Sequence, residues 1–262
     1  MKNINPRTPT KKLVETTTPT AISSVGQIYT KSDNKFYFQD GAGNEHEVQL
    51  VSHYHAEMYI YDDATGTTIN VADQYHAIQG LFSQGEIANF TFSAGDSGSG
   101  NITTADGGAA INIADVGHGL VSGDYVQIQS ANHTGSVEVT RIDDDNFTVP
   151  IAYVGDETGY WQQGDRLVAG TGAAGTYQFG FSTSLLSDGN GKTYKFELCK
   201  NTTHIDESAC ERKIGTGADV GSMGSCGIVT IAEGDEITLI VKNTADATDL
   251  TLKHANLNMH RI

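Results

Sequence analysis

Hydrophobic and polar residues alternate in short runs along most of the chain, with the two-residue period of a β-strand. Gly, Asp, Asn and Ser, the residues that tight turns require, separate these runs. The clearest run contains Ile237, Leu239 and Val241, whose side chains share one face of a predicted strand. No long run has the spacing of an amphipathic helix. The pattern therefore predicts an all-β protein.

Changes in the pattern divide the chain into four regions. Residues 1–24 contain three of the four prolines and too little apolar surface to fold alone, so they are either a disordered terminus or an extended docking arm. Residues 25–52 predict a β-meander connector, which is too small to be stable by itself. Residues 53–93 and 166–262 together predict roughly eight to ten strands, enough for a sandwich or jelly-roll head. Residues 94–165 predict a self-contained set of strands inserted into that head.

Three local predictions within the head depend on alternation alone. The sequence predicts strands at Thr68–Val71 and at Ile87–Phe92. Near the C-terminus the apolar positions change parity, from Leu250 and Leu252 to odd-numbered residues. We therefore expect a β-bulge near Lys253–His254, because one extra residue reverses the two faces of a strand.

Charge and composition limit the classes of partner. The formal net charge of -16 argues against nucleic acid and anionic membranes, since both would repel such a surface. No signal-peptide core and no apolar run of membrane-spanning length is present, so we expect synthesis in a cytoplasm. Three cysteines do not make a disulfide framework. Cys199 and Cys210 flank a predicted turn and could pair, or all three thiols could be reduced packing residues.

Residues with catalytic or metal-binding chemistry form no strong motif. Gly95–Gly100 lacks the frame and the strand-turn-helix context of a nucleophile elbow, so we expect neither an enzyme nor a cofactor. His53 and His55 project from one side of a strand, where three parallel chains could hold a metal ion on a three-fold axis. An ordinary exposed or hydrogen-bonded pair of histidines is the alternative. Asp62–Asp63 and Asp143–Asp145 lack the calcium-loop signature and are interpreted as solvated turns.

Two segments resemble parts of tailed-phage proteins. The stretch GQIYTKSDNKFYFQDGAGNEHEVQL, residues 26–50, is similar to a connector that precedes the C-terminal head in phage structural proteins. Gly119–Asp124 (Gly-Leu-Val-Ser-Gly-Asp) and Asp144–Val149 (Asp-Asp-Asn-Phe-Thr-Val) resemble a small β-barrel module of phage tail and fibre proteins. These likenesses imply a virion component in which the insertion, residues 94–165, is a small β-barrel. They concern structure rather than chemistry.

The C-terminal portion resembles the jelly roll of the C1q/tumour-necrosis-factor type. The likeness lies in Ala174–Phe179, Gly227–Ile231, Gly234–Leu239 and a closing strand over Leu250–Ile262. It implies a homotrimer around a three-fold axis. The aromatic residues that we expect at interfaces, unless they fill the core of the single chain, are Tyr29, Phe36, Phe38, Tyr59 and Tyr61.

The expected function is that of a bacteriophage virion structural protein, a trimeric fibre, spike or decoration protein on the head or tail. Its N-terminal arm would bind another virion protein (capsid, portal or tail), and its jelly-roll head would attach to surfaces through many weak contacts. The protein would be located in the virion. One alternative is a lectin-like tail-fibre tip that binds a host surface glycan. The other is a polysaccharide depolymerase.

Overall fold

The computed structural model describes residues 16–48, 54–78, 81–95, 99–106, 109–215 and 219–262. These residues form twenty-two β-strands and no helix, which confirms the predicted all-β class. No helix that could span a membrane occurs within the described ranges. The chain divides into two compact units, Met1–Ser52 and His53–Ile262, which are described separately.

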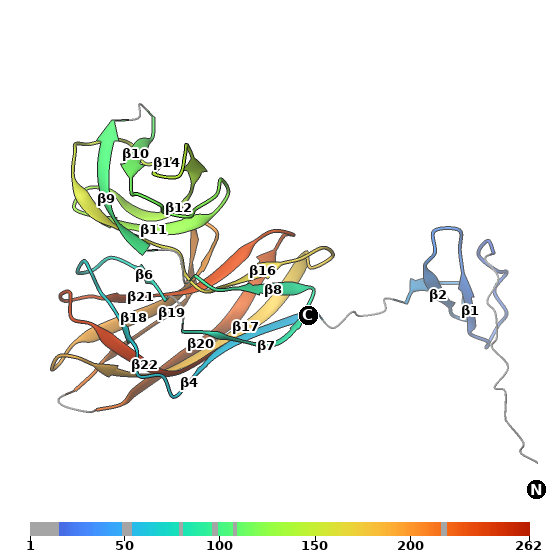
Figure 1. The fold of residues 1–262 in the computed structure, drawn as a ribbon. Helices are drawn as coiled ribbons and strands as arrows, with labels where there is room; N and C mark the ends of the chain where they lie inside the picture. The colour runs from blue at the N-terminus through green and yellow to red at the C-terminus, as the bar shows by residue number, and fades with distance from the viewer. Residues whose placement is uncertain (1–15, 49–53, 79–80, 96–98, 107–108, 216–218) are drawn as a thin grey trace, which may run out of the picture. The chain divides into compact units, whose positions relative to one another are not determined.

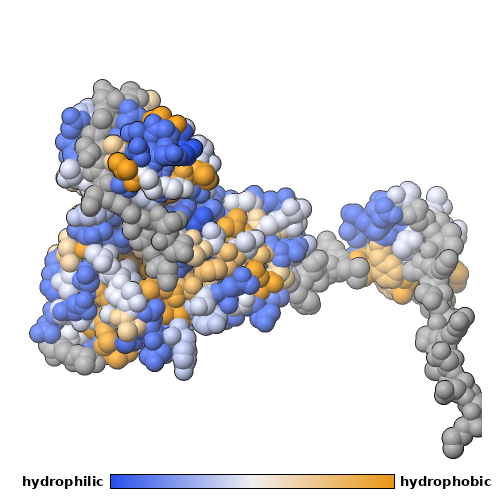
Figure 2. Space-filling model, in the orientation of Figure 1, coloured by the Kyte–Doolittle hydropathy of each residue, from blue (hydrophilic) through white to orange (hydrophobic). Residues whose placement is uncertain are grey.

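The first unit is an antiparallel meander of β1 (Gln27–Thr30), β2 (Phe36–Gln39) and β3 (Glu45–Glu47). On one face Tyr29 stacks on Tyr37, with ring centroids 5.8 Å apart, and both rings are buried. The Tyr29 hydroxyl donates a hydrogen bond to Glu45 on the same face. The opposite face leaves Ile28 and Phe38 exposed, and hydrophobic surface is visible on this unit in Figure 2. One side of the meander is therefore covered by its own chain and the other is open.

The second unit contains two antiparallel six-stranded sheets (Figure 1). Sheet 1 has the order β20-β17-β22-β4-β7, with β5 beside β22, and sheet 2 has the order β19-β18-β21-β16-β8, with β6 beside β21. The strands of sheet 1 are β4 (His55–Tyr61), β5 (Gly66–Thr67), β7 (Ser83–Ala88), β17 (Gly175–Ser187), β20 (Gly221–Ile231) and β22 (Leu250–Arg261). Those of sheet 2 are β6 (His76–Ala77), β8 (Phe90–Ser93), β16 (Arg166–Ala169), β18 (Thr193–Lys200), β19 (Thr203–Lys213) and β21 (Glu236–Asn243).

One apolar core lies between the two sheets, as in a β-sandwich. Tyr177 and Phe179 enter it from β17, and Phe196 and Leu198 enter it from β18. These side chains occupy alternate positions of their strands, so the intervening residues form the outer faces of the sheets. The predicted bulge in the last strand is confirmed: Ser184 pairs with His254 but Leu185 pairs with Leu252, which leaves Lys253 as the extra residue.

Two predicted strands are wrong. In one the backbone turns between the two sheets, and in the other the backbone N–H groups bind a side chain. Ile87–Phe92 is not one strand: Asn89 has a φ of 60°, and the chain leaves sheet 1 after β7 and joins sheet 2 as β8. An asparagine adopts this left-handed conformation more readily than most residues, which makes it a suitable corner. Thr68–Val71 is a loop, because the N–H groups of Asn70 and Val71 bind Nε2 of the buried His76 instead of a neighbouring strand.

The residues between β8 and β16 form a seven-stranded sheet of their own, in the order β12-β11-β15-β9-β10-β14-β13. Its strands are β9 (Ser99–Asp106), β10 (Ile111–Ala114), β11 (Tyr125–Ser130), β12 (Thr134–Glu138), β13 (Thr140–Arg141), β14 (Asn146–Val149) and β15 (Thr158–Gln162). The two ends of this order, β12 and β13, are consecutive in the chain and only Val139 lies between them. The sheet is thus closed by the chain itself, around a separate core that contains Phe147 and Trp161.

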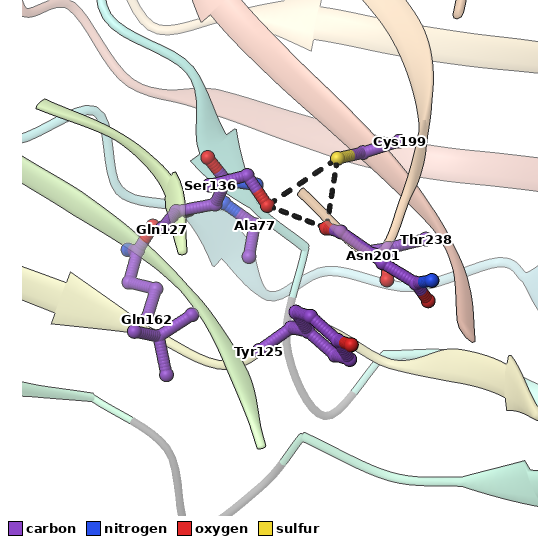
Figure 3. Close-up of a pocket in the computed structure, with 10 residues that line it drawn as sticks. Ala77, Tyr125, Gln127, Ser136, Gln162, Cys199, Asn201 and Thr238 are labelled. Carbon is purple, nitrogen blue, oxygen red and sulfur yellow. Dashed lines mark hydrogen bonds between the residues drawn. The ribbon is translucent and has the colours of Figure 1, made fainter. Parts of the chain in front are cut away.

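The closed sheet contacts the sandwich through polar groups (Figure 3). The Ser136 hydroxyl on β12 donates a hydrogen bond to the carbonyl of Asn201, at 2.7 Å. The Cys199 thiol on β18 lies 3.4 Å from the same hydroxyl. Gln74 of the sandwich donates to the carbonyl of Ser130, and Gln129 donates back to the carbonyl of Tyr75. The cavity at this junction measures about 10 Å³, room for one water molecule and too little for an organic ligand.

Candidate self-association face

The outer face of sheet 1 is built by the residues that alternate with the core residues of four neighbouring strands, β20, β17, β22 and β4. The strand register aligns these residues in four rows across the sheet. We call them the neutral face. The rows are Ile228, Gln178, His260 and His55; Cys226, Gly180, Asn258 and Glu57; Gly224, Ser182, Asn256 and Tyr59; and Ser222, Ser184, His254 and Tyr61.

The neutral face is nearly free of charge. Glu57 is its only Asp, Glu, Lys or Arg, although 18% of all residues in the chain are of these four types and the net charge is -16. The Glu57 carboxylate accepts a hydrogen bond from the Asn256 amide at 2.5 Å, so it is engaged within the face. The other residues are small, amide, imidazole or aromatic, except for the aliphatic Ile228. Such a surface can approach an identical copy without bringing like charges together.

Large apolar side chains lie on the same surface. Tyr61 is 81% exposed, Ile228 is 64% exposed and Tyr59 is 39% exposed. The Tyr61 ring meets the His254 ring edge-on, with centroids 5.5 Å apart. Exposed aromatic rings among short polar side chains are typical of protein interfaces, because their area is large and few rotamers are lost on contact.

The outer face of sheet 2 has the opposite character. Lys195 pairs with Glu197 at 3.3 Å on β18, and Arg166 on β16 pairs with Glu236 at 3.1 Å. The contacts with the closed sheet are also made from this side, since they involve β6 and β18. The low charge is therefore a property of the neutral face and does not follow from composition.

The aromatic residues predicted at interfaces fall into three groups. Tyr59 and Tyr61 lie on the neutral face. Phe36, half-buried, and Phe38, exposed, lie on the open side of the meander. Tyr29 lies on the covered side and is only 4% exposed, because its own chain packs over it. It can therefore offer little surface to a partner, which matches the alternative that aromatic residues fill the core of the single chain.

The predicted histidine pair is only partly described. His53 lies outside the described residues, and His55 is the first residue of β4, half-buried on the neutral face. Among the residues that the structure describes, no group of three or more His, Cys, Asp or Glu side chains could hold a metal ion. The metal site at His53 and His55 stays a prediction. Sequence reasoning missed that His260 lies directly across from His55.

The three cysteines are free thiols. Cys210 lies opposite Phe196 and Cys199 lies opposite His204, so the hairpin of β18 and β19 does not bring the two predicted partners together. Burial raises the pKa of Cys199 and of Cys210 to about 11, as expected for packing residues. Cys226 is exposed on the neutral face and is not a packing thiol.

One cluster in the closed sheet has the residue types of a catalytic triad but not the roles. His133 is fully buried, and its Nδ1 hydrogen-bonds Glu157. Its Nε2 accepts the N–H of Val154 at 3.2 Å, so this nitrogen does not face the Ser130 hydroxyl. That hydroxyl bonds Glu157 and the carbonyl of His133. The base and the nucleophile of a triad must be hydrogen-bonded to each other, and here they are not.

The acidic clusters behave as turns. Asp143 accepts hydrogen bonds from the side-chain amide of Asn146 and from the backbone N–H of Asp145, and these lower the pKa of its carboxyl. Asp63 accepts the N–H of Thr65 in the same manner. These are local Asx-type contacts that stabilise the bends.

Comparisons with known proteins assign neither a family nor a function to the chain. No protein-family model matches the chain, and no curated protein matches it.

Proposed function

We propose that this protein is a structural component whose head associates as a homotrimer through the neutral face. The observation that carries the proposal is that Glu57 is the only charged residue among those of the neutral face, in a chain with a net charge of -16. Three such chains repel one another at long range, so contact is favourable only where the touching surfaces carry little charge. Ile228, Tyr59 and Tyr61 then supply the apolar area that association buries.

The order of the strands supports a jelly-roll head. Count β4 and the seven strands from β16 to β22 from one to eight, leaving out β5 to β8. The first then pairs with the eighth, the second with the seventh, the third with the sixth and the fourth with the fifth. This is the result of winding one long hairpin into two sheets, which is how a jelly roll is made. We propose that the head is of the C1q/tumour-necrosis-factor type, and this strand order and the sequence likeness described above support that proposal.

The virion role rests on the resemblance of residues 26–50 and of the inserted closed sheet to phage connector and tail modules. The open face of the meander, with Ile28 and Phe38 exposed, needs a cover, and two further copies of the chain would provide one. The N-terminal arm would bind a capsid, portal or tail protein, with residues 1–15 lying outside the described part of the chain. The head would then attach the particle to surfaces by multivalency.

The test is the mass of the full chain in solution by light scattering. A trimer has three times the chain mass of 27.9 kDa. Ser182→Arg places a charge in the middle of the neutral face, and we expect it to give single chains. Thr202→Arg, in the exposed turn between β18 and β19, is the matched control and should remain a trimer. A wild-type mass of one chain would refute the proposal.

Cys226 provides a second measurement on the same proteins. Its thiol lies on the neutral face opposite Gly180, so a trimer packed through this face should shield it from a thiol reagent. We expect slow labelling of the wild type and fast labelling of the Ser182→Arg chain. Equal rates in a wild type that is trimeric would show that the copies meet elsewhere.

A further inference from the structure

The closed sheet carries a groove at one end, between the loop that joins β10 to β11 and the turn that joins β13 to β14. The groove has a volume of about 520 Å³. Both segments line it, with Gly117, Gly119, Leu120, Val121, Arg141 and Asp144. Leu120 is also a buried member of the core around Phe147 and Trp161, so the groove reaches that core.

Hydrogen bonds hold the two segments together. The N–H of Gly117 donates to the carbonyl of Asp144 at 3.0 Å. The buried His118 ring bonds both segments: its Nδ1 accepts the N–H of Leu120 at 3.0 Å, and its Nε2 donates to the carbonyl of Asp143 at 3.1 Å. The groove is therefore formed before any partner arrives, and a partner loses little free energy in ordering it.

Aliphatic side chains are exposed in and beside the groove. Val121 lines it and is 58% exposed. Val116 and Ile142 are exposed too, and each is the chain neighbour of a lining residue, Gly117 and Arg141 respectively. Figure 2 shows hydrophobic atoms next to strongly hydrophilic ones on the closed sheet. Exposed apolar side chains with a polar rim mark interaction sites, because contact with a partner removes them from water.

The closed sheet is strongly acidic. Residues 99–162 contain nine Asp and Glu residues and a single Arg, a formal charge of -8 in 64 of the 262 residues and half of the net charge of the chain. The single Arg is Arg141, and its guanidinium pairs with Asp144, which lines the groove with it. Two further carboxylates, Asp143 and Asp145, belong to the same turn. This surface attracts cations and repels anions.

We propose that the groove binds a polypeptide segment of a partner protein in which Lys or Arg side chains flank aliphatic ones. The aliphatic side chains of the segment cover Val121 and its exposed neighbours, and the cationic side chains pair with the carboxylates of the turn. A polyamine would satisfy the charge but leave the aliphatic side chains in water.

The inference rests on the attachment role proposed above and names the class of partner. It does not use the neutral face, because the closed sheet contacts the sandwich on the side of sheet 2.

The experiment measures binding of a fluorescent peptide, Lys-Leu-Lys-Val-Lys-Leu-Lys, to the full-length chain by fluorescence anisotropy. A second peptide, Lys-Ser-Lys-Ser-Lys-Ser-Lys, has the same charge and no aliphatic side chain. We expect the first peptide to bind about tenfold more tightly or better, since it alone buries apolar surface. Equal affinities would show that only the net charge of the chain attracts the peptides.

The first pair of variants tests the apolar contact. Val121→Ser should weaken binding of the aliphatic peptide about tenfold. Val154→Ser is the matched control, because Val154 is 67% exposed on the same closed sheet. It lies before β15, at the end of β11 away from the groove, where Ser130 pairs with Gly159. This control should bind as the wild type does, and equal losses in the two variants would overturn the proposal.

The second pair of variants tests the charge. Asp144→Lys and Asp156→Lys make the same change at two exposed positions, one in the groove and one in the loop before β15. We expect Asp144→Lys to weaken binding of the aliphatic peptide more than about tenfold and Asp156→Lys less than about threefold, since salt screens the distant charge. Similar losses would overturn the proposal.

The mass of each chain in solution separates this proposal from the trimer. All four substituted positions lie outside the neutral face, so these variants should keep the mass of the wild type. A trimer that does not prefer the aliphatic peptide would overturn the groove proposal alone. A wild type that is a single chain and binds the peptide as expected would overturn the trimer alone.

Discussion

Tyr75 donates its phenol hydrogen to the carboxylate of Glu197, a residue 122 positions later in the chain. The same carboxylate accepts His204 Nδ1 at 3.1 Å and lies 3.3 Å from Lys195 Nζ. Lys195 and Lys242 also lie over the Tyr75 ring, at 5.8 and 5.1 Å from its centre. These contacts hold the loop before β6 against β18, next to the contact with the closed sheet.

The Glu197 cluster predicts a loss of stability in acid. Although burial alone raises the pKa of Glu197, the hydrogen bonds from His204 and Tyr75 outweigh it and lower the pKa to about 2, from 4.5. A lowered pKa means that the carboxylate stabilises the fold above about pH 4.5 and that this contribution is lost as the pH falls toward 2. The side chain is only 1% exposed, and the shift corresponds to about 3 kcal/mol.

The measurement is urea denaturation of the wild type and of Glu197→Gln between pH 6 and pH 2.5. The variant should be less stable at pH 6, and the difference should shrink as the pH falls. A constant difference over this range would contradict the assignment.

Asp165 predicts a large loss of stability from one substitution. Its buried carboxylate accepts three backbone N–H groups, from Leu81, Phe82 and Gly95, at 2.7–2.9 Å. Asp165→Ala leaves these three donors without this acceptor, at a cost of about 3 kcal/mol or more in the free energy of unfolding. Chemical denaturation measures the change. Asp188→Ala, at an exposed position, is the control and should change stability by less than about 0.5 kcal/mol.

The closed sheet should be removable without unfolding the head. The two ends of the insertion meet, because the N–H of Gly95 donates to the Asp165 carboxylate at 2.7 Å. A short Gly-Ser linker in place of residues 96–163 keeps both of these residues and the separate core of the sandwich. We expect a cooperatively folding protein with the β-sheet circular dichroism of the head and the oligomeric state of the full chain. Loss of the cooperative transition would show that the two cores depend on each other.

Local sequence determined the inward and outward faces of the long strands. Alternation at Ile237, Leu239 and Val241 placed these residues in the core, where the structure has them. The change of parity after Leu252 predicted the bulge at Lys253, because the two faces of a strand differ strongly in their exposure to water. The all-β class followed from the same pattern.

The tertiary structure decided which segments of the chain, and which of their residues, are neighbours. Asn89 turns the chain from one sheet to the other, and a run of strand-forming residues gives no sign of such a corner. The sequence around Asp165 gives no sign that three backbone N–H groups will donate to its carboxylate in the fold.

The neutral face was hidden in the sequence for the same reason. Its rows come from four strands that are distant in the chain, and the register alone brings Ser182 beside Asn256 and His55 beside His260. Alternation along one strand shows which side chains face outward. It does not show which strands are neighbours, because long-range pairing depends on contacts between segments far apart in the chain.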